Sequence, residues 1–136
     1  MIRQKIYLPK YDWTVYCYYA VSTYYVDEIM ERLWEIGVDA SNAKQAYHNL
    51  SAGDLDTGLC YSNYKLHKSV MVVSNASSPA ELLNSLTHEL YHLTGHIGKA
   101  FNLSSTGEPS AYLSGELSRE IYPRICHLLC NCHSKE

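Results

Sequence analysis

Apolar and β-branched residues run almost without interruption from Trp13 to Val21, a pattern that predicts a β-strand. After this strand, apolar residues recur every three or four positions, which predicts an amphipathic helix that ends at Gly37. The apolar positions of this helix are Val26, Ile29, Met30, Leu33 and Ile36. A second helix is expected from about Ser41 to Leu50, followed by a loop at 54–58.

Two further apolar segments predict a β-hairpin. They are Leu59–Ser62 and Lys68–Ser74, with a turn near Asn63 between them. The second strand runs almost directly into the next helical pattern. It is either an ordinary strand within the sheet or an edge strand that lies beside that helix.

The next helix has a clear start signal. Ser78, Pro79 and Glu81 form the pattern of a capping box, with serine at the N-cap, proline at the first helical position and glutamate at the third. An apolar stripe at helical spacing follows and predicts that one side of this helix is buried. It consists of Leu82, Leu83, Leu86, Leu90, Leu93 and Ile97.

The same helix carries His88, Glu89 and His92 in the arrangement H-E-x-x-H. Two histidines four residues apart lie on one side of a helix, so that their imidazoles can bind one metal ion. Glu89 is then placed to hold or deprotonate a metal-bound water. The chain has seven histidines, so a chance match with polar histidines is the alternative. The helical context favours a zinc site.

A catalytic zinc usually has three protein ligands and one open position. The favoured third ligand is Glu108, at the start of the last predicted helix, and Glu116 is the next candidate. Glutamates on a solvated helix face are the alternative interpretation of both. His96 lies four residues after His92, as His92 does after His88. In a continuous helix, however, His88 and His96 would be about 12 Å apart, too far to bind one ion. A role for His96 next to the metal ligands or towards substrate is therefore preferred.

A final helix is predicted from Glu108, with Pro109 in its first turn and Pro123 expected to kink or split it. Its apolar positions are Tyr112, Leu113, Leu117, Ile121, Ile125 and Leu128. Cys126, Cys130 and Cys132 near its end could be ligands of a second metal. Structural zinc sites usually draw ligand pairs from separate segments, so cysteines without a metal are the preferred reading.

Composition narrows the classes of function. The net charge of −3, without a run of Lys or Arg, gives no basic surface for nucleic acid. No apolar run approaches the length of a membrane span, and the N-terminus lacks the apolar region of a signal peptide. Five cysteines without a regular framework suit a reducing compartment. We therefore expect a single cytoplasmic domain over residues 1–136, with no nucleic-acid or membrane partner.

The pair of motifs carries a family resemblance. His88-Glu89-Leu90-Tyr91-His92, followed by Glu108-Pro109-Ser110-Ala111-Tyr112, resembles the gluzincin branch of zinc metallopeptidases, and most of all small minigluzincin-like proteins of bacterial and phage type. The resemblance covers roughly residues 59–129. Metzincins match less well, because Gly98 stands where they carry their third histidine.

The resemblance implies an α+β fold of zincin type. It has a short mixed sheet, an edge strand beside the active-site helix, and a C-terminal backing helix. It implies Zn²⁺ held by His88, His92 and Glu108, with Glu89 as general base. His96 or Tyr112 is a candidate for oxyanion stabilisation or for supporting the metal ligands. The expected partner is a peptide or protein substrate bound along the strand 68–74.

The leading hypothesis is a zinc-dependent metallopeptidase-like hydrolase that acts in the cytoplasm. One alternative is a protein of gluzincin fold that keeps the metal for stability or binding and cleaves nothing. Another is a regulatory or interaction protein of phage or prophage type that acts through its edge strand.

Overall fold

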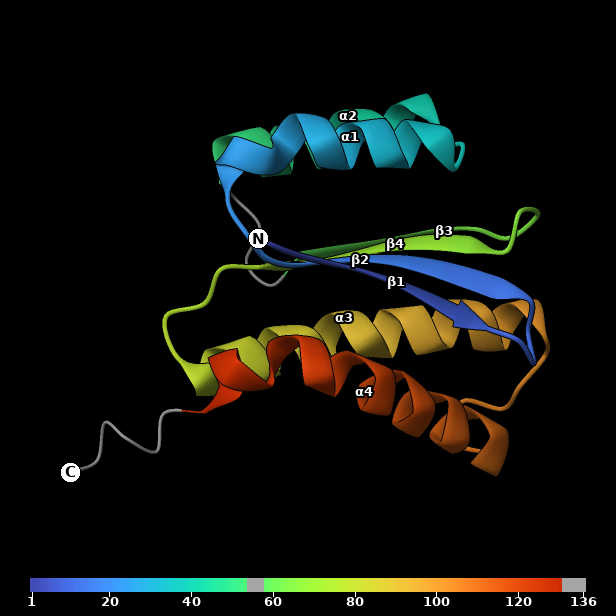
Figure 1. Cartoon of the computed structure of the whole chain (residues 1–136). Coiled ribbons are helices and arrows are strands. Elements are labelled where there is room, and N and C mark those ends of the chain that lie inside the picture. The colour runs from blue at the N-terminus through green and yellow to red at the C-terminus, as the bar shows by residue number, and fades with distance from the viewer. Residues whose placement is uncertain (54–57, 131–136) are drawn as a thin grey trace.

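A four-stranded mixed sheet forms the centre of the molecule (Figure 1). The computed structural model describes residues 1–53 and 58–130. In spatial order the strands are β1 (Ile2–Leu8), β2 (Trp13–Val21), β4 (Lys68–Ser74) and β3 (Gly58–Asn63). The β1–β2 and β3–β4 pairs are antiparallel, whereas β2 and β4 are parallel. The small α+β domain with a mixed sheet is therefore confirmed.

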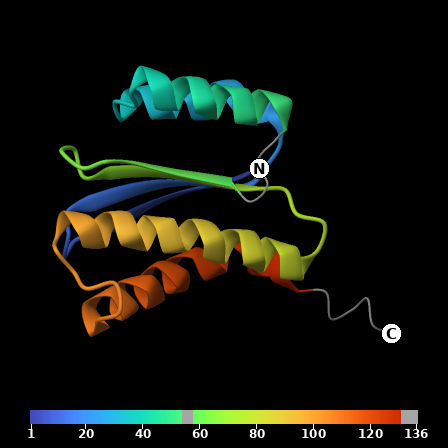
Figure 2. The same cartoon turned by 180° about the vertical axis from the view of Figure 1, so that it is seen from behind.

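Helices cover both faces of the sheet. Figures 1 and 2 show α1 (Val26–Glu35) and α2 (Ala40–Ala52) on one face, and α3 (Pro79–Ala100) and α4 (Glu108–Leu129) on the other. A short 3₁₀ helix, η1 (Thr23–Tyr25), leads into α1. α2 begins one residue before the predicted Ser41 and ends two residues after the predicted Leu50. α4 begins at Glu108, as predicted. The loop predicted at 54–58 lies largely outside the described residues.

The two central strands are buried on both faces, because successive side chains of a strand point in opposite directions. In β4, Met71 and Val73 pack into the cluster under α3 and α4, whereas Val70 and Val72 pack into the cluster under α1 and α2. All four are completely buried. Burial of both sides explains why β4 has a continuous apolar sequence instead of an alternating one.

This position corrects the prediction that 68–74 is an edge strand. β4 lies between β2 and β3, so its backbone is already paired on both sides. The edge on this side of the sheet is β3, and the other edge is β1, which the pattern analysis did not predict. Polar residues alternate along β1, since one of its faces is largely open to solvent.

The start of α3 confirms the capping pattern. The Ser78 side chain accepts a hydrogen bond from the backbone N–H of Glu81, and Pro79 occupies the first helical position. Pro123 does not split α4, which continues from Glu108 to Leu129. In the part of the chain that the structure describes, no helix is long and apolar enough to cross a membrane.

Candidate metal and catalytic site

Helix α3 places the three motif residues together, and Glu89 lies against the start of the edge strand β3. The imidazole rings of His88 and His92 have centroids 5.0 Å apart. The Glu89 Oε2 atom lies 3.9 Å from the Nε2 atom of His88. The structure therefore brings His88, Glu89 and His92 into one group, with two neighbouring imidazoles and a carboxylate.

The members of this group differ in exposure. The side chain of His88 is 52% exposed and that of Glu89 only 3%. His92 is exposed as well. Glu89 lies under the start of β3, where a Cβ atom built on Gly58 would be 3.2 Å from the Cγ atom of Glu89. A metal ion can therefore reach the imidazoles from solvent, while the carboxylate is held from the protein side.

His96 lies one turn beyond His92, and its ring forms a hydrogen bond with the sheet. Its Nδ1 atom is 2.7 Å from the Oγ atom of Ser62, on the edge strand β3. The Ser62 hydroxyl is 2.7 Å from that of Ser69, and the indole N–H of Trp13 donates to Ser69 at 2.8 Å. Burial lowers the pKa of His96, and the nearby His92 and Lys99 lower it further.

Cysteines line the protein side of this region. The Sγ atom of Cys60 lies 3.9 Å from the Nδ1 atom of His96, and burial raises the pKa of the Cys60 thiol strongly. Burial also raises the pKa of Cys17, to about 12. Both therefore remain thiols at neutral pH. The terminal Cys126 is half-buried and Cys130 exposed, and Cys132 lies outside the described residues.

Glu108 lies at the first position of α4, beside the end of α3, and is exposed. The two helices run antiparallel, because Ser114 of α4 donates to Thr94 of α3, while Ser110 lies next to Gly98. Glu108 is thus level with the last turn of α3, about 12 Å along the axis from His92 at 1.5 Å per residue. The structure does not bring Glu108 to the histidine pair.

The other predicted site residues on α4 lie on its far side. Glu116 and Tyr112 line a depression together with Lys10 and Tyr11, from the connection between β1 and β2. That connection belongs to the edge of the sheet opposite β3. Tyr112 is 75% exposed there. The structure does not bring either residue to His88 and His92.

Two histidines supply part of the ligand set that zinc needs. Two imidazoles at this separation fit two ligand positions of a tetrahedral ion. Within residues 1–53 and 58–130, however, no three His, Cys, Asp or Glu side chains lie close enough together to hold a metal. The pair therefore fits zinc as a partial site, and the third ligand, Glu108 or Glu116, stays a prediction.

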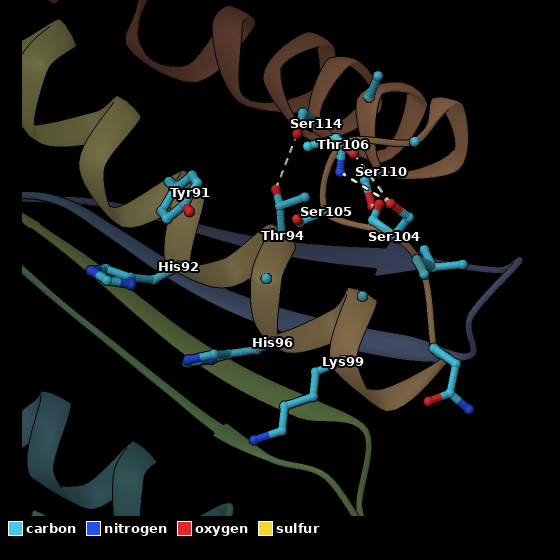
Figure 3. Close-up of a pocket in the computed structure, with 16 residues that line it drawn as sticks. Tyr91, His92, Thr94, His96, Lys99, Ser104, Ser105, Thr106, Ser110 and Ser114 are labelled. Carbon is cyan, nitrogen blue, oxygen red and sulfur yellow. Dashed lines mark hydrogen bonds between the residues drawn. The ribbon is translucent and has the colours of Figure 1, made fainter.

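A groove of about 820 Å³ adjoins the histidines (Figure 3). It lies between the second half of α3 and the first turns of α4, and its wall is rich in hydroxyl groups. Figure 3 shows the imidazoles of His92 and His96 leaving α3 on the same side, with the Thr94–Ser114 hydrogen bond on the α4 side. Lys99 is its one charged side chain apart from histidine.

The sequence pattern does not identify Trp13, Ser62 or Ser69 as part of this site. Each stands in a strand sequence where it reads as an ordinary core or strand residue. Only the strand order brings them into line, since β2, β4 and β3 are neighbours in that order. No sequence signal could have connected them.

Comparison of the chain with protein-family models, with curated proteins and with solved structures finds no match.

Proposed function

We propose that this protein is a zinc-dependent metallopeptidase-like hydrolase. The observation that carries the proposal is the group on α3, in which two exposed imidazoles stand 5.0 Å apart beside a buried carboxylate. The carboxylate lies on the protein side of the first imidazole, which is the position that a base for a metal-bound water requires.

His88 and His92 would bind the ion, and Glu89 would act as the general base and transfer the proton. A bound zinc ion lowers the pKa of its water and polarises a carbonyl. The Glu89 carboxylate, 3.9 Å from the Nε2 atom of His88, is placed to accept a proton from water and to deliver it to the leaving amine. Packing of Gly58 against its Cγ atom keeps the carboxylate in this position.

An extended peptide would bind along β3 rather than along the strand 68–74. β3 is the edge strand on the side of α3 that carries the histidines, and it follows α3 from Gly58, beside Glu89, to Ser62, beside His96. Its outer backbone groups are available for pairing with a substrate strand. The substrate would therefore run parallel or antiparallel to α3, past both histidines.

One observation favours a second candidate, a metal-binding protein that cleaves nothing. The described residues bring together only two of the three ligands of a catalytic zinc. A site of two histidines binds zinc weakly, and a partner protein could then supply the remaining ligand. The two candidates differ in the need for Glu89, which is required for hydrolysis and dispensable for metal-mediated binding.

Zinc content per chain tests the metal site first. The wild type, purified without added metal and then reconstituted, is expected to bind about one zinc, and His92→Ala to bind none. Loss of zinc in Glu108→Ala would identify the third ligand, whereas loss in Glu116→Ala would move it there. A wild type that binds no zinc after reconstitution would refute the proposal.

Hydrolysis is then measured with a mixture of quenched fluorescent octapeptides. Glu89→Gln keeps the shape of the side chain and removes the base, so we expect loss of hydrolysis with zinc retained. Glu31→Gln is the matched control, since Glu31 is an exposed glutamate on α1, on the other face of the sheet. Zinc binding without any hydrolysis in the wild type would favour the second candidate.

A further inference from the structure

A chain of hydrogen bonds crosses the sheet and ends at His96. It begins at the indole of Trp13 on β2, continues through the hydroxyl of Ser69 on β4 and that of Ser62 on β3, and reaches the Nδ1 atom of His96. The three strand residues are all buried, Trp13 and Ser69 completely. A buried polar chain of this length is stable only if its hydrogen atoms are all used.

The direction of the chain follows from its first member. An indole N–H can only donate, so Ser69 must accept from Trp13. The only other partner of the Ser69 hydroxyl among the described residues is Ser62, to which it donates. Ser62 has then accepted one hydrogen bond and donates its own hydrogen to the Nδ1 atom of His96. The Nδ1 atom is thus the acceptor, and the ring proton is on Nε2.

The opposite direction leaves a hydrogen without an acceptor. If Nδ1–H donated to Ser62, one hydroxyl hydrogen would be left over in either of two arrangements. If Ser62 donated to Ser69, the completely buried Ser69 hydroxyl would have no acceptor for its hydrogen. If Ser69 donated to Ser62, the buried Ser62 hydroxyl would have none among the described residues. An unsatisfied buried donor disfavours either arrangement by about fivefold or more.

Cys60 is compatible with this direction. Its Sγ atom is 3.9 Å from the Nδ1 atom of His96, and the cysteine is a thiol at neutral pH. A thiol can donate weakly to an unprotonated nitrogen and can also accept weakly from an N–H group. The direction of the chain is therefore set by Trp13 and the two serines.

We infer that the Trp13–Ser69–Ser62 chain holds His96 in its Nε2–H form, and that His96 is a hydrogen-bond donor to bound substrate and not a metal ligand. Zinc binds an unprotonated ring nitrogen. The Nε2 atom has no hydrogen-bond partner among the described residues, and the ring leaves α3 on the same side as His92 (Figure 3). Both histidines are among the residues that line the groove. Trp13, Ser69 and Ser62 are positioning residues in this scheme.

The spacing along α3 indicates which substrate atom His96 would meet, a step that rests on the proposed function. An ion bound by His88 and His92 lies level with residue 90, and His96 is about 9 Å further along the helix axis. An extended peptide advances about 3.3 Å per residue. The Nε2–H group would therefore meet a backbone carbonyl two to three residues from the cleaved bond. It is too far away to stabilise the oxyanion.

The ring form of His96 is tested directly by long-range ¹H–¹⁵N correlation spectra of histidine-labelled protein at mildly alkaline pH, with and without zinc. His96→Gln assigns the signals. We expect a protonated Nε2 and an unprotonated Nδ1 in the wild type. In Ser62→Ala this preference should weaken, and in Ser62→Thr, which keeps the hydroxyl, it should return. A protonated Nδ1 in the wild type, or no change in Ser62→Ala with the fold intact by circular dichroism, would overturn the inference.

Two further measurements separate the roles of His96. Zinc content should be unchanged in His96→Gln, and loss of zinc there would make His96 a ligand and refute the inference. With a peptide that the wild type cleaves, His96→Gln should raise KM about three- to tenfold and leave kcat nearly unchanged, because a remote hydrogen bond is made in ground and transition states alike. A fall in kcat at constant KM would contradict this placement. If nothing is cleaved, the proposed function fails, while the ring form is still decided by the spectra.

Discussion

Gly58, the first residue of β3, joins the edge strand to Glu89, and its replacement by alanine tests both. Its φ angle is +153°, and a Cβ atom built on it would lie 1.7 Å from the backbone oxygen of Val72. Val72 cannot retreat, because it is completely buried and its strand β4 lies between β2 and β3. In Gly58→Ala the start of β3 must therefore move outward by about 1 Å or more.

The cost of this movement has two parts. Separation of the Gly58–Val73 end of the ladder loses one or two hydrogen bonds of about 1 kcal/mol each. The strained φ angle adds about 1–3 kcal/mol. We expect a loss of about 2–5 kcal/mol in the free energy of unfolding, a substantial part of the roughly 5–15 kcal/mol that is typical of a domain.

Urea unfolding followed by tryptophan fluorescence measures this loss. The chain has two tryptophans, and Trp13 is completely buried whereas Trp34 is 56% exposed. In a Trp34→Phe background Trp13 reports alone on the sheet. At a slope of about 2 kcal/mol per molar urea, the midpoint of Gly58→Ala should fall by about 1–2.5 M.

Gly115→Ala is the matched control. Gly115 lies inside α4, and a Cβ atom built there meets nothing within 4 Å. Alanine should therefore raise the stability by about 0.5–1 kcal/mol. An unchanged midpoint in Gly58→Ala, beside this rise in the control, would refute the close approach of β3 to β4 and with it the packing that holds Glu89.

Three further outcomes are expected. Asp39→Ala removes the N-cap of α2, whose carboxylate accepts from the Asn42 N–H, and should cost about 1 kcal/mol in urea unfolding. Arg3 lowers the pKa of Glu28 through a side-chain hydrogen bond. Its stabilisation is therefore present above the unfolded pKa and lost as pH falls through the folded one, so Glu28→Gln should destabilise at pH 7 but not near pH 2. Cys17, with its pKa raised to about 12, should resist iodoacetamide at pH 8 until the protein unfolds, as mass spectrometry would show.

Local signals predicted most of the helices and three of the four strands. Ser78 and Pro79 specify the start of α3 by chemistry that acts within one turn, and the structure has the cap that they predict. The strand β1 was not predicted, although Ile2, Ile6 and Tyr7 favour strands, because the polar residues 3–5 separate them and the strand depends on pairing with β2. Pairing partners are a property of the whole fold, which single-sequence patterns do not contain.

Strand order also explains the incorrect edge assignment. The apolar sequence Val70–Val73 shows that β4 is buried, yet not which strands flank it. β2 and β4 pair in parallel, and the chain forms α1, α2 and β3 between them. β3 then lies on the outer side of β4. The edge beside the histidines is thus the more polar strand of the hairpin, Gly58–Asn63.

The candidate site likewise contains residues that a local pattern predicts and residues that only the whole fold brings together. His88, Glu89 and His92 meet because one helix carries them, so that their spacing in sequence fixes their spacing in space. Glu108 belongs to another helix, and its distance from His92 depends on how α3 and α4 are aligned, which the Thr94–Ser114 contact sets. A local motif therefore predicts two ligands and a base, whereas a third ligand or a positioning chain such as Ser62 and Ser69 depends on tertiary alignment. The measurement of zinc in Glu108→Ala consequently tests the alignment of the two helices as much as the chemistry of the carboxylate.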